Sequence, residues 1–327
     1  MADAHPAALS LAHLRLGVFP HGKLPSGPTL GRHLRGALGL WLRRQCCPTP
    51  QAAAGVACSI TAPCTHCLAY VARAASDRHP PHPTADGPRP LWVNLCPDPE
   101  VAVWHERRGG TPPVVFEVSC LGPLLPHLDD LVAALLPAQE TGLGHPSYTF
   151  RLGCAALLTC SGRVVWEAPH LDVVRSRVPP ADPADFDFHA PAHVRVGTMV
   201  DVRVDFLTPT AVSHGGLVQR VPGLNAVVDA VGRRLRELAL RWGDSEAAMN
   251  WPVLAGDHIA EWSGGLAGDH RRSRSQGGTR HDLSGFVGQV LYTNVPVEVL
   301  SWLHLAEQLH VGANIPFGCG QLRFHWR

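Results

Sequence analysis

The chain has 327 residues, of which 45% are hydrophobic and 17% charged, so it is long enough for two globular domains. Its formal net charge is only +1, which excludes a protein-wide positive field as the basis of nucleic-acid binding; any basic surface must be local. No stretch reaches the ~18 apolar residues of a membrane helix, and no basic segment precedes an apolar run at the start, so we expect a cytoplasmic protein.

The first half of the chain predicts strands arranged around two helices. The first helix has its apolar residues on one stripe and the arginines Arg32, Arg35 and Arg43 on the opposite face, which either contacts phosphate or is a solvated cationic surface. A segment rich in proline and glycine predicts a loop after it. The predicted strands are 9–19, 113–122 and 148–158, the helices are 30–44 and 125–138, and the loop is 72–91.

Residues 172–193 combine prolines and acidic residues without periodicity and predict an interdomain linker. After it the pattern of the first half begins again. Strands are predicted at 198–208, 285–293 and 321–326 and helices at 224–242 and 297–310, with room for one more strand around 251–262. This order fits a β-α-β-β-α-β ferredoxin-like unit. The predicted fold class is therefore α+β, with tandem ferredoxin-like domains at 1–190 and 195–327 and a cysteine-containing insertion at about 46–90.

The C-terminal segment "HVGANIPFGCGQLRFHW" contains Gly312, Gly318 and Gly320 between a predicted helix and the last strand. Glycine permits positive φ and a close approach of the backbone to another group. The three glycines therefore either form a surface for a ligand or only shape a turn.

The cysteines suggest a metal site in the insertion. Ten cysteines in a reducing compartment favour metal ligands or buried thiols over disulfides. Four of them, Cys46 (or Cys47), Cys58, Cys64 and Cys67, could hold a tetrahedral zinc ion. Such a closed site would stabilise the fold and take no part in catalysis. The alternative is that these are buried or free thiols.

Residues 263–281 predict a long basic loop. Its central part carries Arg271, Arg272, Arg274, Arg280 and His281 with no apolar residue among them. A segment of this composition cannot pack, so it is either disordered or ordered by an anion.

Several segments, taken in order, resemble one family. They are "LRGALGLWLRRQCC", "CSITAPCTHCLAY", "VVFEVSCLGPLLPHLDDLVAALLPAQETGLG", "VDFLTPT", "LSGFVGQVLYT" and "LHVGANIPFGCGQLRF". Together they are similar to the CRISPR-associated endoribonucleases of the RAMP superfamily (the sixth numbered Cas family), in the branch with a cysteine cluster after the first helix. The glycine-rich segment is the most specific of these matches, and Pro316 and Cys319 within it depart from the family pattern.

The resemblance implies an endoribonuclease that needs no metal ion and cuts precursor CRISPR RNA at the 3′ side of a repeat stem-loop. The products would carry a 5′-hydroxyl and a 2′,3′-cyclic phosphate. It also implies that the segment with Gly312, Gly318 and Gly320 contacts RNA or packs beneath it, and that the arginines of residues 263–281 contact the RNA backbone. Arginines on loops and on the first helix suit such contacts, because A-form stems are read mainly through shape and phosphate contacts. The partners would be CRISPR repeat RNA and other subunits of a CRISPR effector complex; neither a membrane nor DNA as a direct substrate is expected.

Cleavage without a metal ion needs a group that deprotonates the ribose 2′-hydroxyl, one that protonates the 5′-oxygen, and a cation near the phosphate. Histidine can perform either proton transfer. Members of the family often carry the catalytic histidine on or near the first helix, which indicates His33 here, with His21 second and Lys23 as the nearby cation. His33 could instead be an ordinary surface or capping histidine.

Two other functions fit parts of the sequence. A non-catalytic RAMP subunit that binds guide RNA would have the same fold, glycines and arginines. A zinc-ribbon protein would bind nucleic acid through the cysteine cluster itself, but the basic residues lie outside that cluster.

Overall fold

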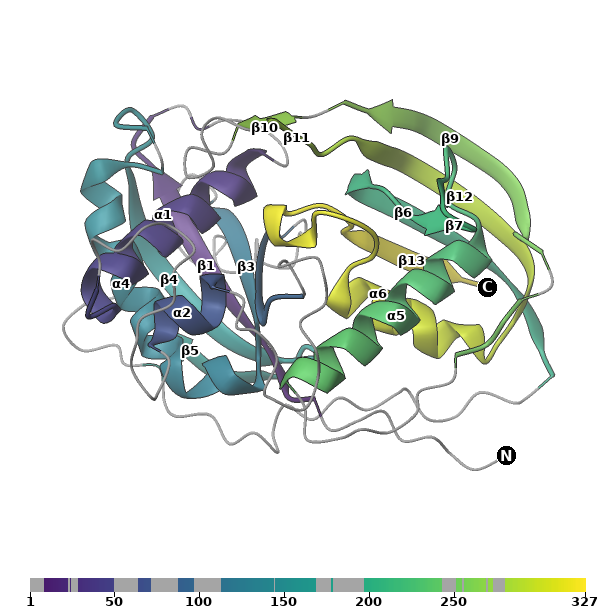
Figure 1. The fold of residues 1–327 in the computed structure, drawn as a ribbon, viewed down its shortest axis with the longest axis horizontal. Coiled ribbons are helices and arrows are strands. Elements are labelled where there is room, and N and C mark those ends of the chain that lie inside the picture. The colour runs from purple at the N-terminus through teal and green to yellow at the C-terminus, as the bar shows by residue number, and fades with distance from the viewer. Residues whose placement is uncertain are drawn as a thin grey trace. The chain divides into compact units, whose positions relative to one another are not determined.

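A computed structural model of the chain describes residues 9–22, 24, 29–49, 64–71, 88–96, 113–143, 145–168, 178, 197–242, 251–254, 256–268, 270–272 and 280–327. The chain divides into two compact units, which correspond in the main to residues 8–188 and 189–327. We refer to them as the N-terminal and C-terminal units (Figure 1). None of the helices among the described residues combines the length and the apolar character needed to cross a membrane.

The N-terminal unit has a β-α-β-β-α-β core with one short helix and one edge strand added. Its antiparallel sheet has the strand order β2-β3-β1-β4-β5, so that β1 lies between β3 and β4. The elements are β1 (Leu11–Pro20), α1 (Thr29–Cys46), α2 (Thr65–Tyr70), β2 (Leu91–Leu95), β3 (Val114–Leu121), the 3-10 helix η2 (Gly122–His127), α4 (Leu128–Thr141), β4 (Phe150–Thr159) and β5 (Val164–Ala168).

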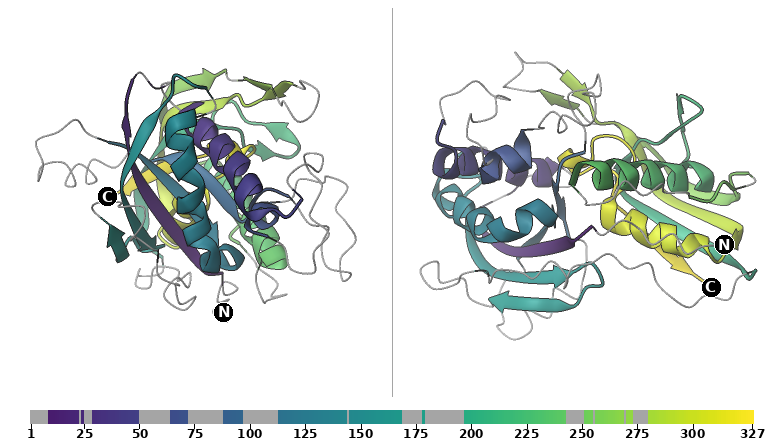
Figure 2. Two further views of the ribbon diagram at one scale, coloured as in Figure 1. Left: turned by 90° about the vertical axis from the view of Figure 1, so that its left-hand side faces the viewer. Right: turned by 60° about the horizontal axis from the view of Figure 1, so that its bottom comes forward.

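The core of this unit forms where α1 and α4 lie against one face of the sheet (Figure 2). Helix α1 buries Leu30, Leu34, Leu38 and Leu42, which recur every four residues and so share one side of the helix. They pack with alternate residues of β1, such as Leu14. This stripe is the periodicity that predicted the helix from the sequence.

The opposite face of β1 and β3 carries a buried polar network. Glu117 accepts a hydrogen bond from Arg15 Nε at 3.0 Å, and its Oε1 lies 3.4 Å from His13 Nδ1. His13 Nδ1 is also 3.0 Å from Ser119 Oγ. Burial alone would raise the pKa of Glu117, but the charge and hydrogen bond of His13, followed by those of Arg15, outweigh it and hold the pKa far below its usual range.

The C-terminal unit repeats the same core topology, with the sheet order β13-β6-β12-β9. Two short hairpins are added, one after β6 and one between β9 and β12. The elements are β6 (Met199–Thr210), β7 (Ser213–His214), β8 (Leu217–Val218), α5 (Leu224–Trp242), β9 (Ile259–Ala267), β10 (His270–Arg272), β11 (Arg280–Asp282), β12 (Gly285–Pro296), α6 (Val299–Leu309), the 3-10 helix η4 (Ile315–Phe317) and β13 (Leu322–Trp326).

Contacts between α5 and its neighbours fix the position of this helix. Arg234 Nε donates a hydrogen bond at 2.7 Å to the carbonyl of Leu309, the last residue of α6, and so caps that helix. Burial lowers the pKa of Arg234 to about 10, which leaves the guanidinium charged near neutral pH. On another side of α5, a Cβ atom at Gly232 would lie 2.3 Å from the ring of Trp251, so glycine makes room for the indole.

The predicted fold class is confirmed: each unit has the strand order of a ferredoxin-like module, and cysteines cluster after the first helix. One prediction was wrong, because residues 263–281 are not simply a loop. The first part of that segment continues β9 to Ala267, and β10 and β11 pair from His270↔Asp282 to Arg272↔Arg280. Strands β2 and β5 and helix α2 were not predicted. The predicted linker lies outside the described residues, apart from position 178.

Candidate functional site

The predicted catalytic histidine, His33, lies on α1 beside an aromatic residue from a distant part of the sequence. Its ring is 5.5 Å from the Tyr148 ring between centroids, with an angle of 80° between the ring planes. Both side chains are half-buried. Tyr148 lies in the connection between α4 and β4, so the packing of α1 and α4 on one sheet brings His33 and Tyr148 together.

A second histidine contacts the same tyrosine. The rings of His145 and Tyr148 are 5.1 Å apart between centroids. The backbone amide of Ser147 donates a hydrogen bond to His145 Nδ1 at 3.2 Å, and Ser147 Oγ lies 2.7 Å from the same nitrogen. Because Nδ1 accepts the amide hydrogen, the neutral His145 imidazole carries its proton on Nε2.

His21, the second predicted catalytic residue, reaches the same connection through its backbone. Its amide donates a hydrogen bond to the carbonyl of Thr149 at 3.1 Å, and its side chain is exposed. His21 and Arg151 both line a hollow of about 370 Å³, and the Arg151 guanidinium lies 4.7 Å from the centroid of the Phe19 ring. Lys23, the predicted cation, lies outside the described residues.

We call His33, His145 and Tyr148 the histidine–tyrosine cluster; His21 adjoins it through its backbone hydrogen bond to Thr149. Sequence reasoning missed His145 and Tyr148, which stand more than 100 positions after His33. The available signal was the turn-forming segment "GHPSYTF", which places an imidazole, a hydroxyl and a phenol between a helix and a strand. Imidazoles donate and accept protons near neutral pH, so the cluster has groups suited to proton transfer.

The arginines of α1 differ in their exposure. Arg32 and Arg43 are half-buried, whereas Arg35 is only 6% exposed. The Arg35 guanidinium lies 4.8 Å from the Tyr70 ring centroid, and the Tyr70 hydroxyl donates a hydrogen bond to the Arg35 carbonyl at 2.8 Å. Burial raises the pKa of Tyr70 to about 12, so the phenol remains a neutral donor. Arg35 therefore joins α1 to α2 and is poorly placed to reach phosphate.

The three C-terminal glycines all have positive φ, between 79° and 85°. A Cβ atom at Gly312 would lie 2.4 Å from the carbonyl oxygen of Ala211, and one at Gly320 would lie 2.0 Å from that of Val311. Gly320 also donates a backbone hydrogen bond to Pro209. Packing against the chain's own backbone therefore explains Gly312 and Gly320 without any ligand.

The glycine-rich segment contacts the base of the hairpin formed by β10 and β11. Asn314 Nδ2 donates a hydrogen bond to the carbonyl of Asp282 at 3.0 Å, and Cys319 Sγ lies 3.9 Å from the carbonyl oxygen of Leu283. Arg271, Arg272 and Arg280 stand on the paired strands of this hairpin, while Arg274 lies outside the described residues. Two segments predicted to bind RNA are thus neighbours within the C-terminal unit.

A hollow in the C-terminal unit has mixed charge. It measures about 420 Å³ and lies on the open face of the sheet, where Asp201 and Glu261 stand among arginines, polar residues and tryptophans. Other lining residues are Arg203, Trp262, Gln289, His325 and Trp326. Its two acidic residues are balanced by Arg203 and Arg327, so the hollow offers no excess positive charge to attract an RNA backbone.

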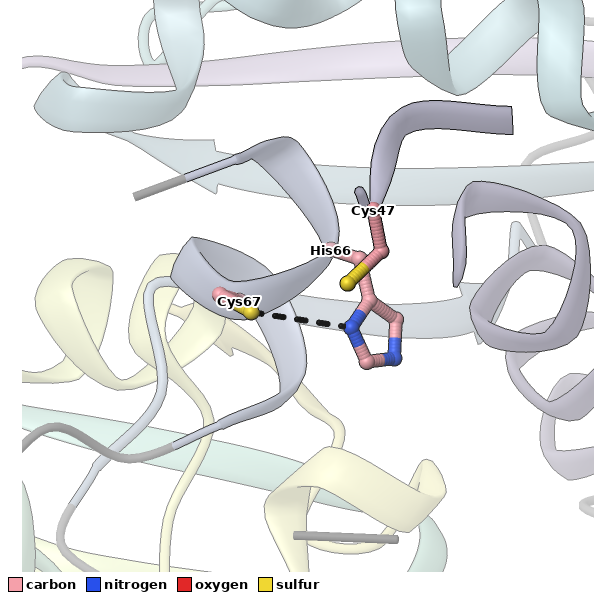
Figure 3. Close-up of side chains that lie close together, drawn as sticks. All are labelled: Cys47, His66 and Cys67. Carbon is pink, nitrogen blue, oxygen red and sulfur yellow. Dashed lines mark hydrogen bonds between the residues drawn. The ribbon is translucent and has the colours of Figure 1, made fainter. Parts of the chain in front are cut away.

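The cysteines after α1 gather around a histidine. The ligand atoms of Cys47, His66 and Cys67 all lie within 4.8 Å of one another (Figure 3). Of the residues predicted from spacing, Cys67 belongs to this group, Cys64 packs against it, and Cys58 lies outside the described residues. Cys46 is half-buried and not in the group.

Burial, followed by the charges of Asp130 and Cys47, raises the pKa of Cys46. Burial also lowers the pKa of His66 to about 4, with help from the charges of Arg43 and Arg89. His66 therefore carries a neutral imidazole at pH 7, whereas the Cys46 thiol is held in its protonated form.

Comparison with known families covers both units. The family model described as CRISPR-associated endoribonuclease Cas6 matches residues 204–322, and a model described as an N-terminal domain matches residues 9–178. A comparison with curated proteins gave no match.

Solved structures similar to this chain include Thermus thermophilus Cas6, which is 16% identical (98% of this chain and 100% of that one covered, TM-score 0.46). A RAMP protein binding different RNA substrates is 9% identical (96% and 99%, TM-score 0.40). The product of a Cas6-related gene from Pyrococcus furiosus is 8% identical (96% and 98%, TM-score 0.37). The match over residues 204–322 assigns the C-terminal unit to the Cas6 family of CRISPR-associated proteins.

Proposed function

We propose that this protein is an endoribonuclease that cuts precursor CRISPR RNA once within each repeat and needs no metal ion to do so. Membership in the Cas6 family supports the substrate class. The catalytic role is supported by the histidine–tyrosine cluster. There the imidazoles of His33, on α1, and His145, in the connection before β4, both contact the Tyr148 ring.

The reaction requires two proton transfers. A base removes the proton of the ribose 2′-hydroxyl, and the resulting oxygen attacks the adjacent phosphorus. As the new phosphorus–oxygen bond forms, the bond to the 5′-oxygen breaks, and an acid gives that oxygen a proton. The products are a 2′,3′-cyclic phosphate and a 5′-hydroxyl.

We assign a catalytic role to His33. It lies on α1, whose apolar face is packed in the core, and this packing holds the backbone of His33 in place. The Tyr148 ring meets the His33 imidazole edge to face, and Tyr148 is a positioning residue. His145 and His21 are the candidates for the second proton transfer, because both contact the segment 148–149.

RNA binding is proposed for the hairpin formed by β10 and β11 and for the adjoining glycine-rich segment. The hairpin provides Arg271, Arg272 and Arg280 for phosphate contacts, with Arg274 from its connecting segment. Gly312, Gly318 and Gly320 form the bend beside it. On α1, Arg32 and Arg43 are retained as candidate contacts, while the burial of Arg35 argues against it.

The test is a cleavage assay with a cognate repeat RNA in EDTA. We expect one cut, with cyclic phosphate and 5′-hydroxyl ends, and no cut when the nucleotide before the scissile phosphate is 2′-deoxy. His33→Ala should lower the single-turnover rate constant by ~10² or more while RNA affinity stays within a few fold. The matched control is His214→Ala, an exposed histidine in the other unit, which should cut at the wild-type rate.

Two results would count against this proposal. If the wild type binds the repeat tightly but never cuts it, the protein is a non-catalytic RAMP subunit that holds guide RNA. If cutting is normal in His33→Ala, the family function survives and the catalytic assignment fails.

A further inference from the structure

A group of cysteines and a histidine lies outside the cluster proposed for catalysis. Cys47 directly follows α1, while His66 and Cys67 belong to α2. Cys47 and Cys67 are 7% and 1% exposed, and neither is part of a disulfide. Cys67 Sγ lies 4.0 Å from His66 Nδ1 (Figure 3). Such a group is suited either to a metal ion or to a disulfide.

The distances suit a tetrahedral zinc ion. With Zn–S bonds of ~2.3 Å and Zn–N bonds of ~2.1 Å, neighbouring ligand atoms are ~3.5–3.8 Å apart. The three ligand atoms here lie within 4.8 Å of one another, so each pair needs to close by no more than ~1.3 Å to reach these distances.

Cys64 is the candidate for the fourth ligand, and its side chain would have to turn toward the other three, because its sulfur is not among the atoms that lie within 4.8 Å of one another. It occupies the N-cap position of α2, three residues before Cys67, so the two form a Cys-x-x-Cys pair at the start of a helix. Cys64 also packs against the buried group made by Cys47, Cys67 and Val71.

The surroundings favour a site that holds negative charge. Three thiolates, a neutral imidazole and Zn²⁺ would carry a net charge of −1. Arg43 and Arg89 lie close enough to His66 to act on it electrostatically, and they would offset that charge. The His66 ring is stacked on Tyr70 at 5.6 Å between centroids, with 6° between the planes, which fixes its orientation.

We propose that Cys47, Cys64, His66 and Cys67 bind one structural zinc ion that joins the end of α1 to α2. Of the two adjacent cysteines that the spacing left open, this set contains Cys47, and it has His66 in place of Cys58. Thiolate and imidazole ligands select zinc over magnesium, calcium or manganese. A site closed by four protein ligands leaves no position for water, so the ion stabilises the fold and does no chemistry.

The experiment compares adjacent cysteines in the full-length protein, purified under reducing conditions with no metal added. Elemental analysis should find one zinc per chain in the wild type and in Cys46→Ser, but less than a tenth of that in Cys47→Ser and Cys67→Ser. Cobalt added to metal-free protein should give the visible bands of tetrahedral thiolate coordination in the wild type and Cys46→Ser only.

A second variant covers the case in which the serine variants fail to fold. His66→Cys preserves four ligands, so it should keep one zinc per chain, while His66→Ala should lose it or bind it far more weakly. The proposal is overturned if reduced wild-type protein holds no zinc and gives no cobalt spectrum, if mass spectrometry finds a Cys47–Cys67 disulfide in its place, or if Cys46→Ser rather than Cys47→Ser loses the metal.

Discussion

Gly320 offers a direct test of why glycines occur near the C-terminus, because the structure supplies a reason that involves no RNA. Its φ is 79°, and a Cβ atom there would lie 2.0 Å from the carbonyl oxygen of Val311. The same two residues form a hydrogen bond, in which the amide of Val311 donates to the carbonyl of Gly320 at 3.0 Å. The Gly320 amide donates to the carbonyl of Pro209 at 3.1 Å.

In Gly320→Ala the left-handed backbone conformation costs about 1 kcal/mol. Relief of the clash must displace Val311, which weakens or breaks these two hydrogen bonds at about 0.5–1.5 kcal/mol each. The free energy of unfolding should therefore fall by about 2–4 kcal/mol. Gly216 is a matched control, since its φ is 82° and a Cβ atom there would have nothing within 4 Å. Gly216→Ala should cost only about 1 kcal/mol.

Urea unfolding of both variants, followed by tryptophan fluorescence and circular dichroism, measures the difference. If Gly320→Ala unfolds at the same urea concentration as Gly216→Ala, the packing argument is refuted. If Gly320→Ala is equally stable but loses RNA affinity, the glycine serves the close approach of RNA, as the sequence suggested.

Three further predictions concern catalysis, RNA binding and acid stability. Tyr148→Phe should keep the single-turnover rate constant within about tenfold of the wild type, because the contact with His33 is made by the ring. Tyr148→Ala should lower the same rate constant by ~10² or more. Equal losses in the two variants would mean that the hydroxyl itself acts. Replacing both Arg271 and Arg272 by alanine should reduce the slope of log RNA affinity against log salt concentration, measured by filter binding, by about 1.5–2. An unchanged slope would mean that these residues do not contact phosphates. Glu117 has a depressed pKa in the folded state, so its stabilising effect is present above the ordinary carboxyl pKa of 4.5 and is lost as the pH falls below it. Glu117→Gln should be less stable than the wild type at pH 7 and should show a shallower loss of stability between pH 5 and pH 3; parallel acid profiles would contradict this reading.

Periodicity predicted the elements that carry one buried face and one exposed face. The α1 leucines recur every four residues, and β6 alternates between buried and exposed positions along its length, so both were recognisable from sequence. Strand β2 has only five residues, four of them buried, and offers neither alternation nor length. Strand β9 is exposed along its length and contains glycines, so it lacks a buried face that alternation could reveal. The sequence therefore predicted only a strand around residues 251–262, which overlaps the start of β9.

The candidate sites were predicted in part, because their residues converge from separate segments. His33 was selected from chemistry and its place on α1, but its neighbour Tyr148 comes from beyond the second helix, and nothing in the local sequence relates the two. Cysteine spacing indicated a metal site after α1, yet a search by cysteines alone passed over His66. Spacing also could not distinguish Cys46 from Cys47, which point to different surroundings: Cys46 interacts with Thr65 and Asp130, and Cys47 with the buried group.

The hairpin formed by β10 and β11 has a consequence for how such proteins diverge. The ladder between β9 and β12 ends at the pair Ala267↔Gly285, and the hairpin follows beyond it, with Asp282 and Leu283 in contact with the glycine-rich segment. Its sequence can therefore change in length and charge while the sheet beneath keeps every rung. If the hairpin binds RNA as proposed, exchanging it between relatives would change which RNA is bound while the sheet beneath keeps its fold.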